Sequence, residues 1–202
     1  MKNDREYRTL NLEVEKREED SEPSYIVRGY ASTFERYLLF KDGDIEYYEQ
    51  IDPKAFDECD MTDVVFRVDH EGAVYARSSA GTLEVGVDEH GLYDRADLSK
   101  TAKARELFED IQAGNYPKQS FAFTVKEDSY NKETHTRTIL KIAKLYDVSP
   151  VSFPANPTTE LDVATRDYFN GVIEMERAER LEAEKREKDR KRLELKLKLM
   201  ED

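Results

Sequence analysis

Several residue types are scarce in this chain of 202 residues, and each shortage narrows what the protein can be. A single cysteine, Cys59, excludes an internal disulfide and fits a reducing compartment. One cysteine and three scattered histidines, His70, His90 and His135, make a zinc site improbable. Glycine-rich phosphate loops and Gly-x-Ser-x-Gly are absent, so neither a nucleotide site nor an α/β-hydrolase elbow is supported. We therefore expect no metal and no other cofactor.

Positive charge is also in deficit, because 32 Lys and Arg residues stand against 45 Asp and Glu residues. A surface that neutralises nucleic-acid phosphates must be basic, so we expect no nucleic-acid partner. No stretch approaches the roughly 18 apolar residues of a membrane-spanning helix. The first residues also lack the apolar core of a signal peptide. We expect an intracellular protein that is neither secreted nor bound to a membrane.

The charge divides the chain into two parts. Residues 166–202 carry 11 basic and 11 acidic residues, so the whole net charge of -13 lies before them. Beyond about Leu161, acid–base pairs four residues apart, such as Glu176 with Arg180, predict a long charged helix. Alternating leucines from Leu193 to Leu199 leave its end open between strand-like and disordered. We predict a domain over residues 1–160 and a charged helical extension over 161–202, either a solvated arm or a partner-binding helix.

Within the first part, alternation of apolar and polar residues predicts a series of short strands. A helix is expected from a cap at Ser99 to about Ala113, and a shorter one over 52–56. This pattern indicates a mainly β fold with flanking helices, of the α+β class. A closed or nearly closed antiparallel barrel is the preferred architecture, since closure removes exposed strand edges. The strands are expected over residues 7–16, 25–34, 45–51, 64–70, 82–87, 92–98, 120–125 and 136–148.

Ser120 lies in a stretch, residues 117–125, that runs from a turn into a strand. Phe121, Phe123 and Val125 form its apolar face, and Ser120 leads an opposite face of small residues. A hydroxyl on a face of small side chains leaves room for another chain to lie across it. Ser120 is therefore either the nucleophile of a serine protease or an ordinary turn or strand-edge serine.

A serine nucleophile needs a base, and a third group that orients the base. His90 and His135 lie in polar, turn-rich stretches, whereas His70 ends the apolar row of the strand over 64–70. An imidazole there could exchange a proton with a serine near neutral pH, or be a rim histidine without chemistry. Asp147, at the end of the strand over 136–148, is either the third member or a solvated strand-end aspartate.

Seven short blocks of residues occur in a fixed order along the chain. They are Arg-Gly-Tyr-Ala-Ser at 28–32, Ile-Asp-Pro-Lys-Ala-Phe at 51–56, Asp-His at 69–70, Gly-Leu-Tyr at 91–93, the helix before Gly114, Gln-Ser-Phe-Ala-Phe at 119–123 and Asp-Val-Ser-Pro-Val-Ser-Phe-Pro-Ala at 147–155. In this order they resemble the prohead maturation proteases of tailed phages, distant relatives of the herpesvirus assemblins. The resemblance covers roughly residues 25–157, and its last block is the most specific.

The resemblance implies a β-barrel ringed by helices, with Ser120 as the nucleophile and His70 as its base. Asp147 stands where many relatives have glutamate, so its shorter side chain must approach His70 more closely. Assemblins use a second histidine as the third member, which leaves the role of Asp147 open. Assemblins also act as dimers, which implies a homodimer.

The resemblance also implies a task. Such endopeptidases are packed inside the assembling prohead in the host cytoplasm. There they digest the scaffolding protein, or a scaffold-like segment of the major capsid protein, and often themselves. The tail would then anchor the enzyme or be removed by self-cleavage. The alternative is a non-enzymatic capsid-assembly or scaffolding protein with an inactive protease-like barrel; an unrelated esterase is a more distant one.

Overall fold

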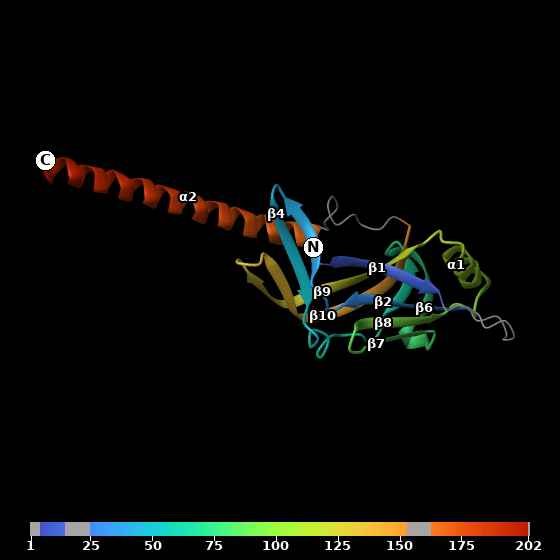
Figure 1. Ribbon diagram of the computed structural model, residues 1–202. Coiled ribbons are helices and arrows are strands. Elements are labelled where there is room, and N and C mark those ends of the chain that lie inside the picture. Colours follow the sequence, from blue (N-terminus) through green and yellow to red (C-terminus); the bar gives the residue numbers. More distant parts are fainter. Residues whose placement is uncertain (1–4, 15–24, 153–162, 202) are drawn as a thin grey trace. The chain divides into compact units, whose positions relative to one another are not determined.

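The computed structural model describes residues 5–14, 25–152 and 163–201 of the chain (Figure 1). The chain divides into two units, Met1–Asp162 and Val163–Asp202. Division into two domains with separate tasks stays a prediction. The described elements of the first unit are β1 Glu6–Val14, β2 Ile26–Thr33, β3 Tyr37–Asp42, β4 Ile45–Ile51, β5 Val65–Val68, β6 Glu71–Arg77, the 3-10 turn η1 Ser78–Ala80, β7 Leu83–Val87, β8 Gly91–Asp97, α1 Ala102–Gln112, β9 Lys118–Asn131 and β10 Thr136–Val151.

One ten-stranded sheet organises the first unit. Its strands follow the order β3-β4-β10-β9-β1-β2-β8-β7, and β5 and β6 branch from β10. The mainly β fold with helices is thus confirmed. No ladder among the described residues joins β7 back to β3, so the predicted barrel is not confirmed.

The long strand β10 is lined along one edge by the chain from β4 to β5. Near its start β10 pairs in parallel with β4, and near its end with β5. Between these ladders, Ile142 N–H donates to the Ala55 carbonyl at 2.9 Å, and Leu145 N–H donates to the Asp60 carbonyl at 3.1 Å. The short helix predicted over 52–56 is wrong: residues 53–58 form turns closed by bonds between residues three apart, such as Asp57 N–H to the Lys54 carbonyl, while the Ala55 carbonyl bonds to β10.

The hydrophobic core lies against the aromatic face of β9 and against α1. The rings of Phe121 and Phe123 stack at 4.7 Å between centroids, and both residues are fully buried. Helix α1 begins at Thr101, whose hydroxyl accepts the Ala104 N–H, and not at the predicted cap Ser99. Its apolar stripe confirms the periodicity seen in the sequence. The buried residues of α1 are Ala104, Leu107, Phe108 and Ile111.

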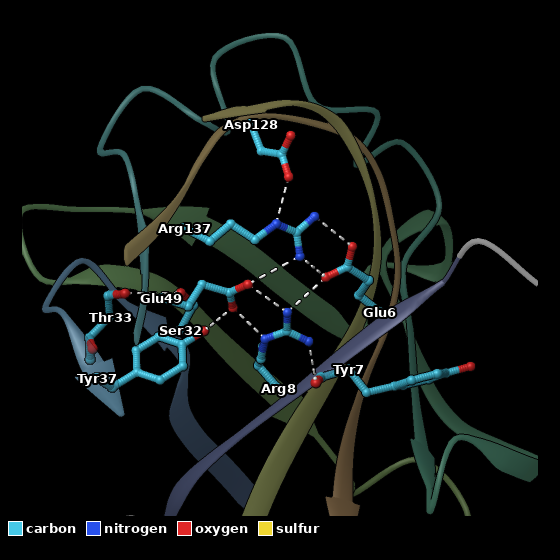
Figure 2. Close-up of polar contacts among 9 residues, drawn as sticks. All are labelled: Glu6, Tyr7, Arg8, Ser32, Thr33, Tyr37, Glu49, Asp128 and Arg137. Carbon is cyan, nitrogen blue, oxygen red and sulfur yellow. Dashed lines mark hydrogen bonds and ion pairs between the residues drawn. The ribbon is translucent and has the colours of Figure 1, made fainter. Parts of the chain in front are cut away.

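Four charged side chains form a buried ion cluster, made of Glu6 and Arg8 of β1, Glu49 of β4 and Arg137 of β10 (Figure 2). Arg8 binds both carboxylates, with Nε 2.5 Å from Glu49 and Nη2 2.7 Å from Glu6. Arg137 donates two hydrogen bonds to Glu6, at 2.7 and 3.0 Å. Burial works to raise the pKa of Glu6, yet the charge of Arg8 and the bonds from Arg137 bring it below its ordinary value. The cluster therefore ties three strands together through charged groups.

The second unit is a single long helix, α2 Val163–Glu201. Exposed acid–base pairs four residues apart run along it, such as Arg186 with Glu182 at 2.6 Å and Lys191 with Glu187 at 2.7 Å. The predicted charged helix is confirmed, and it continues through the leucine-rich stretch whose structure the sequence left open. Among the described residues, no helix combines the length and the apolar character needed to cross a membrane.

Candidate active site

Ser120 lies in β9, an interior strand of the sheet with β10 on one side and β1 on the other. It pairs with Ser149 of β10 and with Thr9 of β1. Its side chain belongs to the face of β9 opposite the stacked phenylalanines, as the alternation predicted. This small-residue face is also buried: Ser120 is 2% exposed and Ala122 is fully buried.

A β-bulge places Asp147 on the same face of the sheet as Ser120. Leu145 pairs with Phe123 on the core face, but Asp147, two residues later, pairs with Ala122 on the opposite face. The extra residue, Tyr146, accounts for the change, since a bulge opposes two residues of one strand to one of the other. Without it, the period of two would direct Asp147 into the aromatic core.

His70 lies in the two-residue turn that joins β5 to β6, and not at the end of a strand as predicted. Val68 pairs with Glu71, and both residues between them have positive φ, 48° at Asp69 and 59° at His70. This is the signature of a tight hairpin turn, and Asp and His tolerate it better than most residues. Asp69 fixes the turn to the end of β10, because its N–H donates to the Pro150 carbonyl at 3.1 Å.

His70 and Asp147 form a hydrogen-bonded pair. The Nδ1 atom of His70 lies 2.6 Å from Oδ1 of Asp147, so the aspartate reaches the imidazole despite its short side chain. A carboxylate only accepts, so the proton between the two groups is on Nδ1, and in the neutral form of the ring Nε2 then carries the lone pair. Nε2 is buried and has no hydrogen-bond partner among the described residues. The ring of Tyr7 packs beside the imidazole at 4.5 Å between centroids.

The structure thus brings His70 to Asp147 directly and Ser120 to the same face of the sheet. No hydrogen bond between the Ser120 hydroxyl and His70 is found among the described residues. Ser149 completes the group: it lies opposite Ser120, and its Oγ donates to Asp147 at 2.7 Å. The sequence reasoning missed Ser149, although its position two residues after Asp147 on one strand face was a usable signal.

The other candidates for chemistry lie elsewhere. His90 packs against Tyr30 at 5.9 Å, and Nδ1 of His135 lies 3.1 Å from the Tyr130 hydroxyl. Among the described residues, no group of three or more His, Cys, Asp or Glu is arranged to hold a metal ion. Burial raises the pKa of the Cys59 thiol to about 11, so it is a poor nucleophile at neutral pH.

The residue before Ser120 takes part in a buried polar pair. Gln119 donates from Nε2 to Oδ1 of Asp94 in β8, and both residues are almost completely buried. The other two oxygens, Asp94 Oδ2 and Gln119 Oε1, have no hydrogen-bond partner among the described residues. Burial raises the pKa of Asp94 to about 7, with the bond from Gln119 opposing it. Protonation of Asp94 supplies the donor that the pair lacks.

This raised pKa makes stability depend on pH. Unfolded Asp94 loses its proton near pH 4, whereas the folded residue keeps it to about pH 7. The proton on Asp94 therefore makes its full contribution to the free energy of unfolding below pH 4. This contribution falls as pH rises from 4 to 7 and is absent above pH 7. At about 1.4 kcal/mol for each unit, the loss is at most about 4 kcal/mol. Asp94→Asn keeps the amide partner and does not titrate.

We expect Asp94→Asn to be more stable than the wild type at pH 8, by about 2 to 4 kcal/mol, and similar to it at pH 4. Urea unfolding at several pH values measures the difference. Glu84→Gln, an exposed site on the neighbouring strand β7, is the matched control and should show no such trend. If the free energies of unfolding of wild type and Asp94→Asn differ by the same amount from pH 4 to pH 8, the folded protein does not hold a proton at Asp94.

Comparisons with known proteins bear on most of the chain. The family model of the caudovirus prohead serine proteases matches residues 11–172, a range that contains Ser120, His70 and Asp147. Neither the search of curated proteins nor the search of solved structures finds a significant match. A family model that spans most of the chain, together with a β-rich fold, identifies the family. The chain belongs to the caudovirus prohead serine proteases, a family whose members act in capsid maturation.

Proposed function

We propose that this protein is an endopeptidase in which Ser120 attacks the scissile carbonyl and His70 takes the serine proton. Asp147 holds the imidazole through Nδ1 and stabilises its charged form. His70 gives this proton to the leaving amine as the acyl-enzyme forms. Water then hydrolyses the acyl-enzyme, and His70 takes a proton from the water and returns it to Ser120. The observation that carries the proposal is the 2.6 Å bond from His70 Nδ1 to Asp147. It leaves Nε2 as the basic nitrogen of the ring, and Nε2 is buried without a hydrogen-bond partner among the described residues.

Membership of the family supports a proposal for the substrates. We propose that the enzyme cleaves the scaffolding protein, or a scaffold-like segment of the major capsid protein, inside the prohead in the host cell. It also cleaves itself, and the exposed helix α2 is the segment anchored or removed. Its charged pairs over residues 182–191 are solvated, so α2 can be cut in that part without loss of buried side chains, whereas Phe169 and Val172 near its start are buried. We further propose a homodimer, by analogy with the assemblins. These proposals need no nucleic acid and no membrane.

Co-expression with the major capsid and scaffolding proteins of the same phage tests this function. We expect defined shorter products on a gel, with new termini found by mass spectrometry, and a shortened form of the enzyme itself. His70→Ala should abolish every product while assembly continues. If wild type and His70→Ala both give shells of full-length proteins, the chain is a non-enzymatic assembly protein. Hydrolysis of small esters without any peptide product would indicate an esterase instead.

A further inference from the structure

Ser149 is a second hydroxyl in this region that the mechanism above does not use. It lies in β10, is fully buried and is paired with Ser120 across the β9–β10 ladder. Its Oγ donates to Oδ1 of Asp147 at 2.7 Å. The same oxygen lies 2.6 Å from Nδ1 of His70. One carboxylate oxygen of Asp147 therefore accepts two hydrogen bonds.

We propose that Ser149 is a positioning residue, which holds the Asp147 carboxylate so that its Oδ1 faces His70. The torsion that rotates a carboxylate has broad minima, so a single bond to His70 leaves the group free to turn. Ser149 lies two residues further along the same strand face, which puts its hydroxyl within reach of that oxygen. A hydrogen bond to a charged group is stronger than a neutral one, and it holds the acceptor in place. This inference rests on the proposed function.

The hydrogen bonds also distinguish the roles of Ser120 and Ser149. The proton of Ser149 is directed at Asp147, which accepts and cannot pass it to a substrate. No hydrogen bond joins Ser149 to His70 among the described residues. A nucleophile must instead give its proton to the base. Ser149 therefore acts through Asp147, while Ser120 is the hydroxyl left for the attack.

A double-mutant cycle tests this role on a peptide that spans the cleavage site found by co-expression. Ser149→Ala should lower kcat about 10-fold and leave KM within about twofold, because only orientation of the base is lost. In an Asp147→Ala background, the same change should lower kcat less than twofold, since the carboxylate that Ser149 orients is already gone. Equal losses in the two backgrounds would show a structural effect alone and overturn the role.

Proton NMR gives a readout that does not depend on activity. In wild type the Nδ1 proton of His70 is expected far downfield, and Ser149→Ala should move it further, because His70 then has the Asp147 oxygen to itself. A resonance unchanged by Ser149→Ala would count against the proposal. Ser149→Thr keeps the hydroxyl and should restore most of kcat; if its added methyl prevents folding, the cycle and the NMR shift still decide.

The result also distinguishes failure of this inference from failure of the proposed function. If Ser120→Ala remains active, the serine mechanism itself is wrong, whatever Ser149→Ala does. If Ser120→Ala is inactive and Ser149→Ala cleaves as fast as the wild type, only the role of Ser149 is wrong.

Discussion

Replacing Ser120 by alanine is expected to lower kcat for peptide cleavage by roughly 10⁵-fold or more, with little change in KM. Without the hydroxyl no acyl-enzyme forms, and only direct attack by water remains. The fold should survive, because the side chain loses one oxygen and no hydrogen bond of that hydroxyl is found among the described residues. We expect the free energy of unfolding to change by no more than about 1 kcal/mol. Steady-state assays on the processing-site peptide measure kcat and KM, and urea unfolding measures the free energy of unfolding.

Ser129→Ala is the matched control, since Ser129 lies on the exposed part of the same strand β9. It should leave kcat within twofold of the wild type. A fluorophosphonate that reacts with activated serines offers an independent check. It should label the tryptic peptide that contains Ser120 in Ser129→Ala, and not in His70→Ala. Cleavage by Ser120→Ala at more than a tenth of the wild-type rate would exclude Ser120 as the nucleophile.

Local alternation in the sequence was enough to predict the strand that carries Ser120. Phe121 and Phe123 are so much larger and more hydrophobic than their neighbours that the core face of β9 is unambiguous, and the stacked rings confirm it. The same period predicted most strands of the first unit, but it missed β3 and β6. Strand β6 was missed because Asp69 and His70 form a tight turn without a glycine between the two strands. A turn that uses residues other than glycine gives a weak signal.

The position of Asp147 relative to His70 could not be derived from the sequence. It depends on the bulge at Tyr146, which shifts the register of β10 by one residue and exchanges its two faces. It also depends on the parallel pairing of β5 with the end of β10, a contact between segments about 80 residues apart. Neither feature can be recognised from the alternation of apolar and polar residues along the sequence. The pattern offered His70 and Asp147 only as candidates, and the resemblance to the family supported His70 but left the role of Asp147 open.

The buried ion cluster was equally invisible to sequence patterns. Glu6, Arg8 and Glu49 look like the polar side of half-exposed strands, because a charged residue is normally placed in water. Burial becomes tolerable only when opposite charges from several strands meet with good geometry. That condition depends on which strands are neighbours, and strand order cannot be derived from hydrophobic periodicity.

Arg137→Met is expected to destabilise the fold more than any surface substitution, by about 3 to 5 kcal/mol. Arg137 donates to Glu6 and to Asp128, the latter at 2.6 Å, and it lies 3.2 Å from Glu49 (Figure 2). Methionine fills a similar volume but leaves two buried glutamates with Arg8 as the charge partner shared between them. The cost is therefore the penalty of buried charge that has lost its compensation, and it should appear as a lower midpoint in urea with an unchanged m-value.

Arg77→Met supplies the matched control. Arg77 also forms a short ion pair, 2.6 Å from Asp63, but both side chains are well exposed to solvent. Water already screens such a pair, so its loss should cost less than about 1 kcal/mol. Equal costs at the two sites would show that burial of the cluster does not determine its energy. The comparison also concerns the candidate active site, because Glu6 and Arg8 flank Tyr7 in β1, whose ring packs beside His70. If the cluster holds β1 in place, Arg137→Met should lose activity at temperatures below its unfolding midpoint, and Arg77→Met should not.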